Sequence, residues 1–497
     1  MKNILELLEQ SARKHPDKSA FIDENVIMSY EMLLRTSMSI GTSLLNLGVR
    51  NRPIAIYLEK SVDLVSAMMG VVYSGNFYTV IDTDMPSDRI EKIFDTLKPT
   101  AVITDMNRLY KAINLSVATV FSVNELSSYI PDKKKLKSIR SAQIDTDPVY
   151  CLYTSGSTGV PKGTILTHRN VLAYSEWVVN EFSFDERTVF ANQTPFYFSM
   201  SVTDIFSTLR VGATLVMIPK QYFSFPIQLV ELMNRHYVNT IYWVPSAISI
   251  VANMKVFDYL KPLYLKKVLF AGEVMPAKQL NYWIDSLGDE VIFANLFGPT
   301  EATDICTYYT LKRRFRDDEP LPIGSACDNC DVFIIDDNGL ESNEGELYIR
   351  GSFLASGYYN NPDKTAEAFV QNPINEAYPE ICYKTGDLVK LNEAGELMYL
   401  GRKDFQIKRM GYRIELGEIE TAACSFEGVK ECACVYKADS DNLVLFYSAD
   451  KLDDNELMDR LKRKLNDYMI PNRLVKLSVL PHNPNGKIDR LALKNSI

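Results

Sequence analysis

The sequence predicts an α/β protein with a large N-terminal domain of stacked βαβ sheets, a β-rich subdomain and a small α+β C-terminal domain. Up to about residue 320, short apolar runs alternate with helical patterns, which is typical of βαβ units and largely parallel sheets. Beyond that point strand-like runs dominate, and a compact tail follows. A chain of 497 residues is also too long for one core, so two or more domains are expected.

The alternation is clearest in the first part of the chain. Residues 53–57, Pro-Ile-Ala-Ile-Tyr, form an unbroken apolar run, which indicates a buried strand. Residues 61–72 follow as a helix whose apolar face carries Val62, Leu64, Val65, Met68 and Met69. Further strands are expected at 100–104, 214–218, 240–244 and 267–271. The basic run 133–137 is expected to be a solvated loop rather than a binding patch.

The last third of the chain predicts smaller units. Strands of a β-rich region are expected at 344–350 and 395–400. After Gly401-Arg402 a compact α+β unit is predicted, with a helix at 415–426, a hairpin at 432–449 and a second helix at 455–468. We therefore place a domain boundary near Asp404, with one domain over 1–403 and the other over 404–497.

Composition excludes several classes of protein. The net charge of −9 lacks the basic footprint of a nucleic-acid binder. No run of about 18 uncharged apolar residues is present, so no membrane span is expected. Acidic residues interrupt the apolar N-terminus, which argues against a signal peptide and for a cytoplasmic protein. The close cysteine pairs, at 327 and 330 and at 432 and 434, lie far from every histidine and are expected to be buried thiols rather than metal ligands.

A loop at 153–163, Tyr-Thr-Ser-Gly-Ser-Thr-Gly-Val-Pro-Lys-Gly, is the strongest local signal for chemistry. It follows the apolar run 149–152 and therefore leaves a strand. Its glycines allow a close approach of the backbone to an anion, its hydroxyls can donate to phosphate oxygens, and Lys162 adds a positive charge. A flexible Ser/Gly linker is the alternative, but such linkers do not usually join a buried strand to a helix. The pattern is not a Walker A loop, because GxxxxGK[ST] is absent here.

This loop resembles the phosphate loop of adenylate-forming enzymes, the family of acyl-CoA synthetases, luciferases and adenylation domains of nonribosomal peptide synthetases. The other motifs of the family follow in order over nearly the whole chain. They are Phe-Gly-Pro-Thr-Glu-Ala-Thr at 297–303, Tyr-Lys-Thr-Gly-Asp at 383–387, Gly-Arg-Lys-Asp-Phe-Gln-Ile-Lys at 401–408, Gly-Tyr-Arg-Ile-Glu at 411–415 and Pro-Asn-Gly-Lys-Ile-Asp-Arg at 484–490.

The resemblance implies a ligase that uses ATP and Mg²⁺ to convert a small carboxylic acid into its acyl-adenylate and then transfers the acyl group to a thiol. Catalytic roles fall on Lys487, Thr300, Glu301 and Lys162, with Glu301 as the metal ligand and Lys487 bridging the substrate carboxylate and the α-phosphate. Residues implied to bind ATP are Thr154, Ser155, Gly156, Ser157, Thr158, Gly159, Asn295, Phe297, Asp387, Arg402 and Lys408. The small domain would be mobile, rotating about Asp404 to withdraw Lys487 and to admit the thiol beside Gly411.

Within the family the chain looks most like stand-alone amino-acid ligases, in particular the D-alanine–carrier-protein ligase group. Residues implied to line the acid pocket are Ser199, Met200, Thr203, Tyr242, Leu269, Ala271, Gly272, Leu296, Asp304 and Ile305. Ser199 occupies the position where α-amino-acid ligases carry an aspartate that pairs with the substrate ammonium. Because a buried ammonium without a carboxylate partner is costly, D-alanine and other α-amino acids are disfavoured.

Several alternatives stay open at this stage. Asp304 either takes over an amine placed differently, as in a β-amino or ring-amino acid, or points to solvent or caps a helix. A neutral aryl or short aliphatic acid is also compatible with Ser199. The thiol is that of a phosphopantetheinylated carrier protein or of coenzyme A. A catalytically silent homologue is disfavoured, because the chain keeps Lys162, Glu301, Asp387, Arg402 and Lys487.

Overall fold

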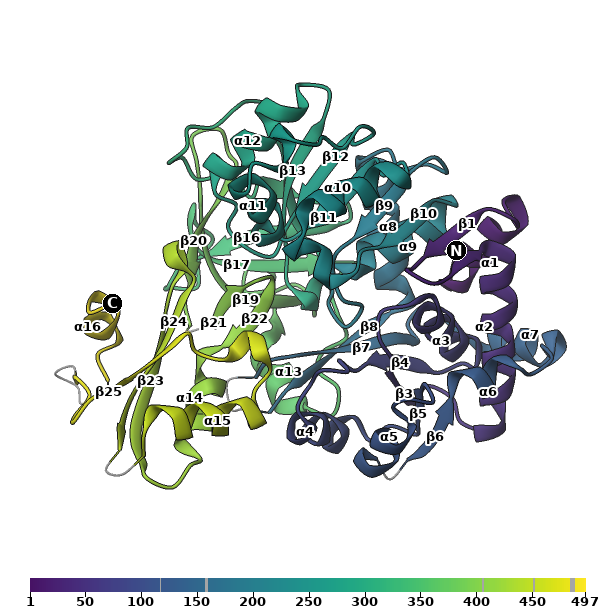
Figure 1. The fold of residues 1–497 in the computed structure, drawn as a ribbon, viewed down its shortest axis with the longest axis horizontal. Helices are drawn as coiled ribbons and strands as arrows, with labels where there is room; N and C mark the ends of the chain where they lie inside the picture. The colour runs from purple at the N-terminus through teal and green to yellow at the C-terminus, as the bar shows by residue number, and fades with distance from the viewer. Residues whose placement is uncertain (117, 157–159, 405, 450–451, 483–487) are drawn as a thin grey trace.

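The computed structural model describes residues 1–497 except 117, 157–159, 405, 450–451 and 483–487 (Figure 1). Two large, mainly parallel sheets, a smaller antiparallel sheet and a separate C-terminal unit follow one another along the chain. The predicted α/β fold class, with its β-rich subdomain and small C-terminal domain, is confirmed.

The first large sheet has six strands in the order β6-β5-β3-β4-β7-β8. Its strands, in that order, are β6 Thr119–Ser122, β5 Ala101–Thr104, β3 Pro53–Tyr57, β4 Phe77–Val80, β7 Pro148–Thr154 and β8 Lys162–Thr167. All neighbours are parallel except β7 and β8, which form an antiparallel pair. The phosphate loop is thus the connection of this last pair, and it leads into a strand and not into the helix that the sequence predicted.

The second large sheet has nine strands in the order β15-β14-β13-β12-β11-β9-β10-β1-β2. Their bounds, in that order, are β15 Ser325–Ala326, β14 Thr307–Thr310, β13 Ile292–Phe297, β12 Lys267–Phe270, β11 Thr240–Trp243, β9 Val189–Asn192, β10 Thr214–Met217, β1 Ser19–Ile22 and β2 Ile27–Ser29. The strands from β13 to β1 are parallel, and every residue of β11 is buried. Sheets covered on both faces by helices carry such continuous apolar runs.

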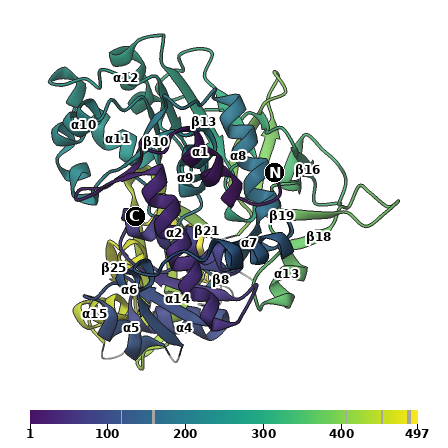
Figure 2. The same cartoon turned by 90° about the vertical axis from the view of Figure 1, so that its right-hand side faces the viewer.

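Helices connect and cover these strands. Their bounds are α1 Leu5–Lys14, α2 Tyr30–Leu44, α3 Val62–Tyr73, α4 Ser87–Leu97, α5 Leu109–Leu115, α6 Val123–Ser127, α7 Lys133–Ala142, α8 His168–Glu181, α9 Ser201–Val211, α10 Pro226–Arg235, α11 Pro245–Asn253, α12 Ala277–Leu287 and α13 Pro362–Ala368. Local sequence fixes several starts: the Ser61 hydroxyl accepts from the Leu64 N–H at the start of α3, and a proline opens α10 and α11. Helix α8 packs on α9 (Figure 2), and α2 packs on α3 (Figure 1).

The β-rich subdomain is an antiparallel sheet whose strands are β16 Cys330–Ile335, β17 Glu344–Gly351, β18 Phe369–Gln371, β19 Ile381–Leu391 and β20 Leu397–Arg402. The small unit contains β21 Gln406–Arg409, β22 Tyr412–Glu415, α14 Leu416–Cys424, β23 Val429–Lys437, β24 Asn442–Ala449, α15 Asp454–Lys464, β25 Arg473–Lys476 and α16 Arg490–Asn495. Strands β21 and β22 form a hairpin whose turn, Met410-Gly411, has positive φ at both residues.

The hydrophobic core divides along the same lines. One cluster of buried side chains spans both large sheets and extends into the β-rich subdomain, whereas the small unit has a cluster of its own around Ile419, Leu445 and Leu461. Figure 1 shows the small unit beside the large domain, with α16 farthest from it. A unit with its own core can change its contacts with a neighbour without unfolding.

Two local predictions are wrong. The basic run 133–137 is the first half of α7 and not a loop, because Asp132 caps the helix by accepting from the Lys135 N–H and Leu136 is buried. The helix expected at 455–468 ends at Lys464, where Leu465 turns to an extended backbone. Each described helix is too short or too polar to cross a lipid bilayer. Cys327, Cys330, Cys432 and Cys434 are buried and free.

Candidate active site

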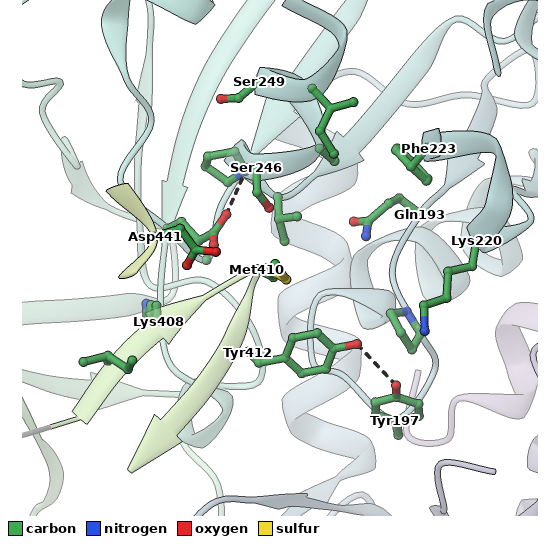
Figure 3. Close-up of a pocket in the computed structure, with 18 of the residues that line it drawn as sticks. Gln193, Tyr197, Lys220, Phe223, Ser246, Ser249, Lys408, Met410, Tyr412 and Asp441 are labelled. Carbon is green, nitrogen blue, oxygen red and sulfur yellow. Dashed lines mark hydrogen bonds between the residues drawn. The ribbon is translucent and has the colours of Figure 1, made fainter. Parts of the chain in front are cut away.

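A cleft of about 1540 Å³ lies between the large domain and the small unit. Figure 3 shows Lys408 and Tyr412 on the strands of the β21–β22 hairpin and Met410 in its turn, across the cleft from Gln193, Ser246 and Lys220 of the large domain. The Tyr412 and Tyr197 hydroxyls are 3.4 Å apart across the interface. Concave sites of this kind at domain interfaces are where small molecules usually bind.

One end of the cleft has the groups that a nucleoside needs. Asn295, near the end of β13, donates from Nδ2 to the Pro322 carbonyl at 2.8 Å, which fixes the orientation of its amide. The Phe297 ring lies 5.8 Å from the Tyr399 ring, and the Lys408 ammonium lies 4.8 Å from its centroid. Asn295, Phe297 and Lys408, all predicted to bind ATP, therefore line one part of the cleft.

Asp387 and Arg402 face each other across the register of β19 and β20. Arg402 donates from Nη1 to Asp387 Oδ1 at 3.0 Å and binds Asp404 through Nε and Nη2. Asp387 is buried, yet no described residue donates to its Oδ2. This oxygen is available to accept from a diol. Asp404, the predicted hinge, begins the connection to β21 and is held by Arg402.

The phosphate loop is described only at its two ends, and Ser157, Thr158 and Gly159 lie outside the described residues. Gly156 is so close to the Val160 carbonyl that a Cβ atom would lie 2.1 Å from the oxygen, so only glycine fits. The Thr154 hydroxyl is buried and has no hydrogen-bond partner among the residues that the structure describes. Lys162, at the start of β8, lies 5.1 Å from the centre of the Tyr358 ring. Burial lowers the pKa of Lys162 to about 8, and Arg413 acts in the same direction.

Glu301 is fully buried, and its carboxylate is bound by groups from two other parts of the chain. Arg413 of β22 donates from Nη1 to both carboxylate oxygens, at 2.9 and 2.7 Å. The Tyr358 hydroxyl donates to Oε1 at 2.7 Å. Burial alone would raise the pKa of Glu301, but the charges of Arg413 and Lys162 and the Tyr358 hydrogen bond outweigh it and hold the pKa at about 2. Glu301 is therefore ionised at neutral pH.

Asp304, three residues further on, has a different environment. Its Oδ2 accepts from the hydroxyls of Thr203 at 2.7 Å, Tyr174 at 3.0 Å and Tyr242 at 3.2 Å. No described residue donates to Oδ1. This oxygen is also not completely buried, so a further donor can reach it. Burial raises the pKa of Asp304 to about 6, although the three hydroxyls act in the opposite direction. The side chain is buried and therefore does not point to bulk solvent. No described backbone N–H donates to it, so it does not cap a helix there.

The other predicted pocket residues surround this carboxylate only in part. Gly272 and Leu296 line the cleft itself. The side chains of Met200, Thr203, Tyr242, Leu269, Ala271 and Ile305 are buried behind it. Ser199 is partly exposed and accepts from the Thr300 hydroxyl at 3.3 Å. Asp304 and these buried side chains therefore lie outside the lining of the open cleft.

Two residues next to the predicted metal ligand were given no role by the sequence. Arg413 was quoted in the Gly-Tyr-Arg-Ile-Glu motif, but its partner Glu301 lies 112 residues earlier, so no local spacing could reveal the pair. Tyr358 lies in a Gly-Tyr-Tyr run with no chemical signal of its own. Lys487, the predicted adenylation lysine, lies outside the described residues.

The residues present fit a nucleoside triphosphate. The Thr154 hydroxyl and Asp387 Oδ2, which no described residue binds, supply a phosphate donor and a ribose acceptor, and the Phe297 ring supplies an apolar wall. A carboxylate such as Glu301 is the ligand type that Mg²⁺ prefers. In this arrangement, however, both of its oxygens are bound by Arg413.

Comparison with known proteins agrees with this geometry. The model of the AMP-binding enzyme family matches residues 8–359, and that of the AMP-binding enzyme C-terminal domain matches 418–487. An L-proline–(L-prolyl-carrier protein) ligase of Pseudomonas fluorescens is 33% identical over 100% of both chains. A D-alanine–D-alanyl carrier protein ligase of Lacticaseibacillus rhamnosus is 31% identical over 99% of this chain and 98% of that protein. The solved structure of a double mutant of o-succinylbenzoate CoA synthetase from Bacillus subtilis has a TM-score of 0.85, with 20% identity over 100% of this chain and 98% of that one.

Proposed function

The chain belongs to the AMP-binding enzyme family and is an ATP-dependent, AMP-forming ligase, and we propose that it activates an amine-bearing carboxylic acid and transfers it to the phosphopantetheine thiol of a carrier protein. The observation that supports the amine is Asp304, a buried carboxylate whose donors among the described residues are all neutral hydroxyls. A substrate ammonium would supply the missing charge. The carrier protein is supported by two relatives that match end to end and are named as carrier-protein ligases.

The proposed division of labour follows the charges of the site. Asp387 accepts from the ribose, and Lys162 with the phosphate loop binds the phosphates. Mg²⁺ at Glu301 would neutralise charge on the α-phosphate during attack by the carboxylate. Lys487 joins the substrate carboxylate to that phosphate. We also propose that the domains meet at Asp404, that the small one rotates there between the two half-reactions, and that the protein works in the cytoplasm.

The geometry favours an amine that is not in the usual α position. Ser199 offers only a hydroxyl where an α-ammonium is expected, and that hydroxyl already accepts from Thr300. Asp304 lies deeper, against Tyr174, Thr203 and Tyr242. A β-amino or ring-amino acid would carry its ammonium farther from the reacting carboxylate and toward Asp304. This supports such acids over D-alanine.

Pyrophosphate release across a panel of acids tests the proposal. The panel contains D- and L-alanine, other α-amino acids, β-amino acids, aminobenzoates, hydroxybenzoates and short fatty acids. We expect the highest turnover with a β-amino acid or an aminobenzoate. Highest turnover with D-alanine or with an acid that lacks an amine would contradict the proposed role of Asp304.

The acceptor is tested with the acid that gives the highest turnover. Thioester formation is measured with coenzyme A and, separately, with the phosphopantetheinylated carrier protein of the Pseudomonas fluorescens prolyl ligase. We expect saturable transfer to the carrier protein and weak transfer to coenzyme A. Saturable turnover with coenzyme A alone would make the enzyme an acyl-CoA synthetase.

The Lys487→Ala variant separates the two half-reactions. We expect pyrophosphate release to fall by about 10²- to 10³-fold, the usual effect of removing one preorganised donor. Transfer from preformed acyl-adenylate should keep its rate. Loss of both half-reactions would contradict the role given to Lys487.

A further inference from the structure

The carboxylate expected to bind the divalent cation is occupied by an arginine of the small unit. Arg413 approaches both oxygens of Glu301 with one nitrogen, at 2.9 and 2.7 Å. Glu301 is 0% exposed and the Arg413 side chain 12%, so the pair is shielded from water. A charge-assisted contact of this kind in a buried site is strong and orients both partners.

The ion pair belongs to a broader contact between the small unit and the large domain. The Ser155 hydroxyl of the phosphate loop donates to the Arg413 carbonyl at 2.6 Å. Gly411 lies so close to Val244 that an added Cβ would be 2.5 Å from it. Arg89 of α4 forms a second buried ion pair with Glu418 of α14. The β21–β22 hairpin is thus docked directly on the phosphate-binding residues.

A divalent cation and this guanidinium cannot use the same carboxylate oxygens. Metal–oxygen distances near 2.1 Å for Mg²⁺ would put the ion where the Arg413 nitrogen now donates. Two cations on one carboxylate would also repel each other strongly in a buried site. We propose that Arg413 is a positioning residue that takes the place of the divalent cation at Glu301, so that metal occupancy and this docked arrangement exclude each other.

This proposal rests on the proposed role of Glu301 as the metal ligand, and it adds an order of events. The cation must leave Glu301 before the hairpin docks, and Arg413 then binds a carboxylate that would otherwise remain buried with the Tyr358 hydroxyl as its hydrogen-bond donor and no directly bound cation. Thermodynamic linkage makes the effect reciprocal: docking weakens metal binding by the same factor by which metal weakens docking. Arg413 therefore ties the release of the metal to the change of arrangement.

The test measures metal affinity without turnover. Mn²⁺ is titrated into the full-length protein with α,β-methylene-ATP, and free Mn²⁺ is followed by its electron paramagnetic resonance signal. We expect Arg413→Gln to bind Mn²⁺ more tightly than the wild type, by roughly 5- to 150-fold, the usual range of coupling between sites. Arg413→Ala serves as a second variant, and circular dichroism verifies that each variant is folded.

Two controls locate the effect at Glu301. Arg460→Gln removes a charge of α15 that binds Glu456 and is expected to leave Mn²⁺ affinity unchanged. In a Glu301→Gln background, Arg413→Gln is expected to have no further effect. Equal Mn²⁺ affinity of the wild type and both Arg413 variants would overturn the proposal, and so would tighter binding that persists without Glu301.

A second measurement follows the arrangement itself. With donor and acceptor dyes on the two domains, Mn²⁺ is expected to change their distance in the wild type but not in Arg413→Gln. A change of equal size in the dye-to-dye distance of both proteins would overturn the proposal that Arg413 and the divalent cation exclude each other at Glu301. The ligase activity is measured separately by pyrophosphate release, so its failure and that of the metal exchange can be told apart.

Discussion

Glu301 and Asp304 are two buried carboxylates three residues apart with opposite surroundings. Glu301 is bound by Arg413 and Tyr358 with Lys162 nearby, and its pKa lies at about 2. Asp304 accepts from three neutral hydroxyls, and its pKa is raised to about 6. Among the described residues, a cation binds Glu301 directly, whereas Asp304 has only hydroxyl donors and feels the charge of Lys408 without a direct contact. This difference fits the two proposed roles. Glu301 would bind either Arg413 or the divalent cation, whereas Asp304 would bind the ammonium group of the substrate.

Removing the charge of Glu301 should have the largest effect of the changes that test this difference between the two carboxylates. Glu301→Gln leaves Arg413 buried without its partner, which typically costs about 3 to 5 kcal/mol of unfolding free energy. Urea denaturation at pH 7 measures this loss. Arg460→Gln, which breaks an exposed pair, should cost less than about 1 kcal/mol. A Glu301→Gln variant as stable as the wild type would mean that the pair does not hold the small unit in place.

Removing the charge of Asp304 should damage catalysis instead. If a substrate ammonium pairs with this carboxylate, Asp304→Asn should lower kcat/KM for the preferred amine-bearing acid about 100-fold, or ~3 kcal/mol. ATP affinity should not change, because Asp304 lies away from the nucleotide groups. Steady-state pyrophosphate release with varied acid and varied ATP separates the two effects. An equal loss for acids with and without an amine would contradict ammonium binding.

The same substitution should stabilise the substrate-free protein. The folded pKa of Asp304 lies above its ordinary value of 3.8, so the stability that protonation supplies is complete below pH 3.8 and is lost as pH rises through 6. Asp304→Asn does not titrate, so it should exceed the wild type by roughly 1 to 3 kcal/mol at pH 7. The margin should shrink between pH 6 and pH 4 in urea denaturation. A destabilised variant at pH 7 would mean that the hydroxyls compensate the charge fully.

Much of the fold follows from local patterns. Strand β3 has the predicted bounds, and α3 differs from its prediction by one residue at each end. The apolar pattern of a buried strand or an amphipathic helix can be recognised within a dozen residues. The loop predicted at 133–137 was wrong because the local pattern there gives almost no sign of a helix. Its lysines are exposed, as solvated residues should be, and the two features that make it helical are one cap and one buried leucine.

The site shows where sequence reasoning ends. The motifs single out Asn295, Phe297 and Arg402, which line one cleft, and Asp387, which is bound by Arg402, because each motif is local. Their roles in binding ATP stay predictions. The pairing of Arg413 with Glu301 joins two domains, and the hydroxyls around Asp304 come from α8, α9 and β11. Such environments depend on tertiary packing, which decides whether a buried carboxylate is paired.

The smallest expected effect concerns Ser199, which lies beside Thr300 and accepts from its hydroxyl. Ser199→Asp would place a second carboxylate where an α-ammonium is expected. A partly exposed ion pair at this position should stabilise the bound α-amino acid by on the order of 1.4 kcal/mol, which raises kcat/KM about tenfold. The matched change Ser201→Asp, two residues away on α9, tests whether any nearby carboxylate suffices. If Ser199→Asp does not improve the use of any α-amino acid, the position does not contact the substrate amine. Combined with Asp304→Asn, it should move the preference from the distal amine to the α-amine, because the cation then has only one carboxylate to bind.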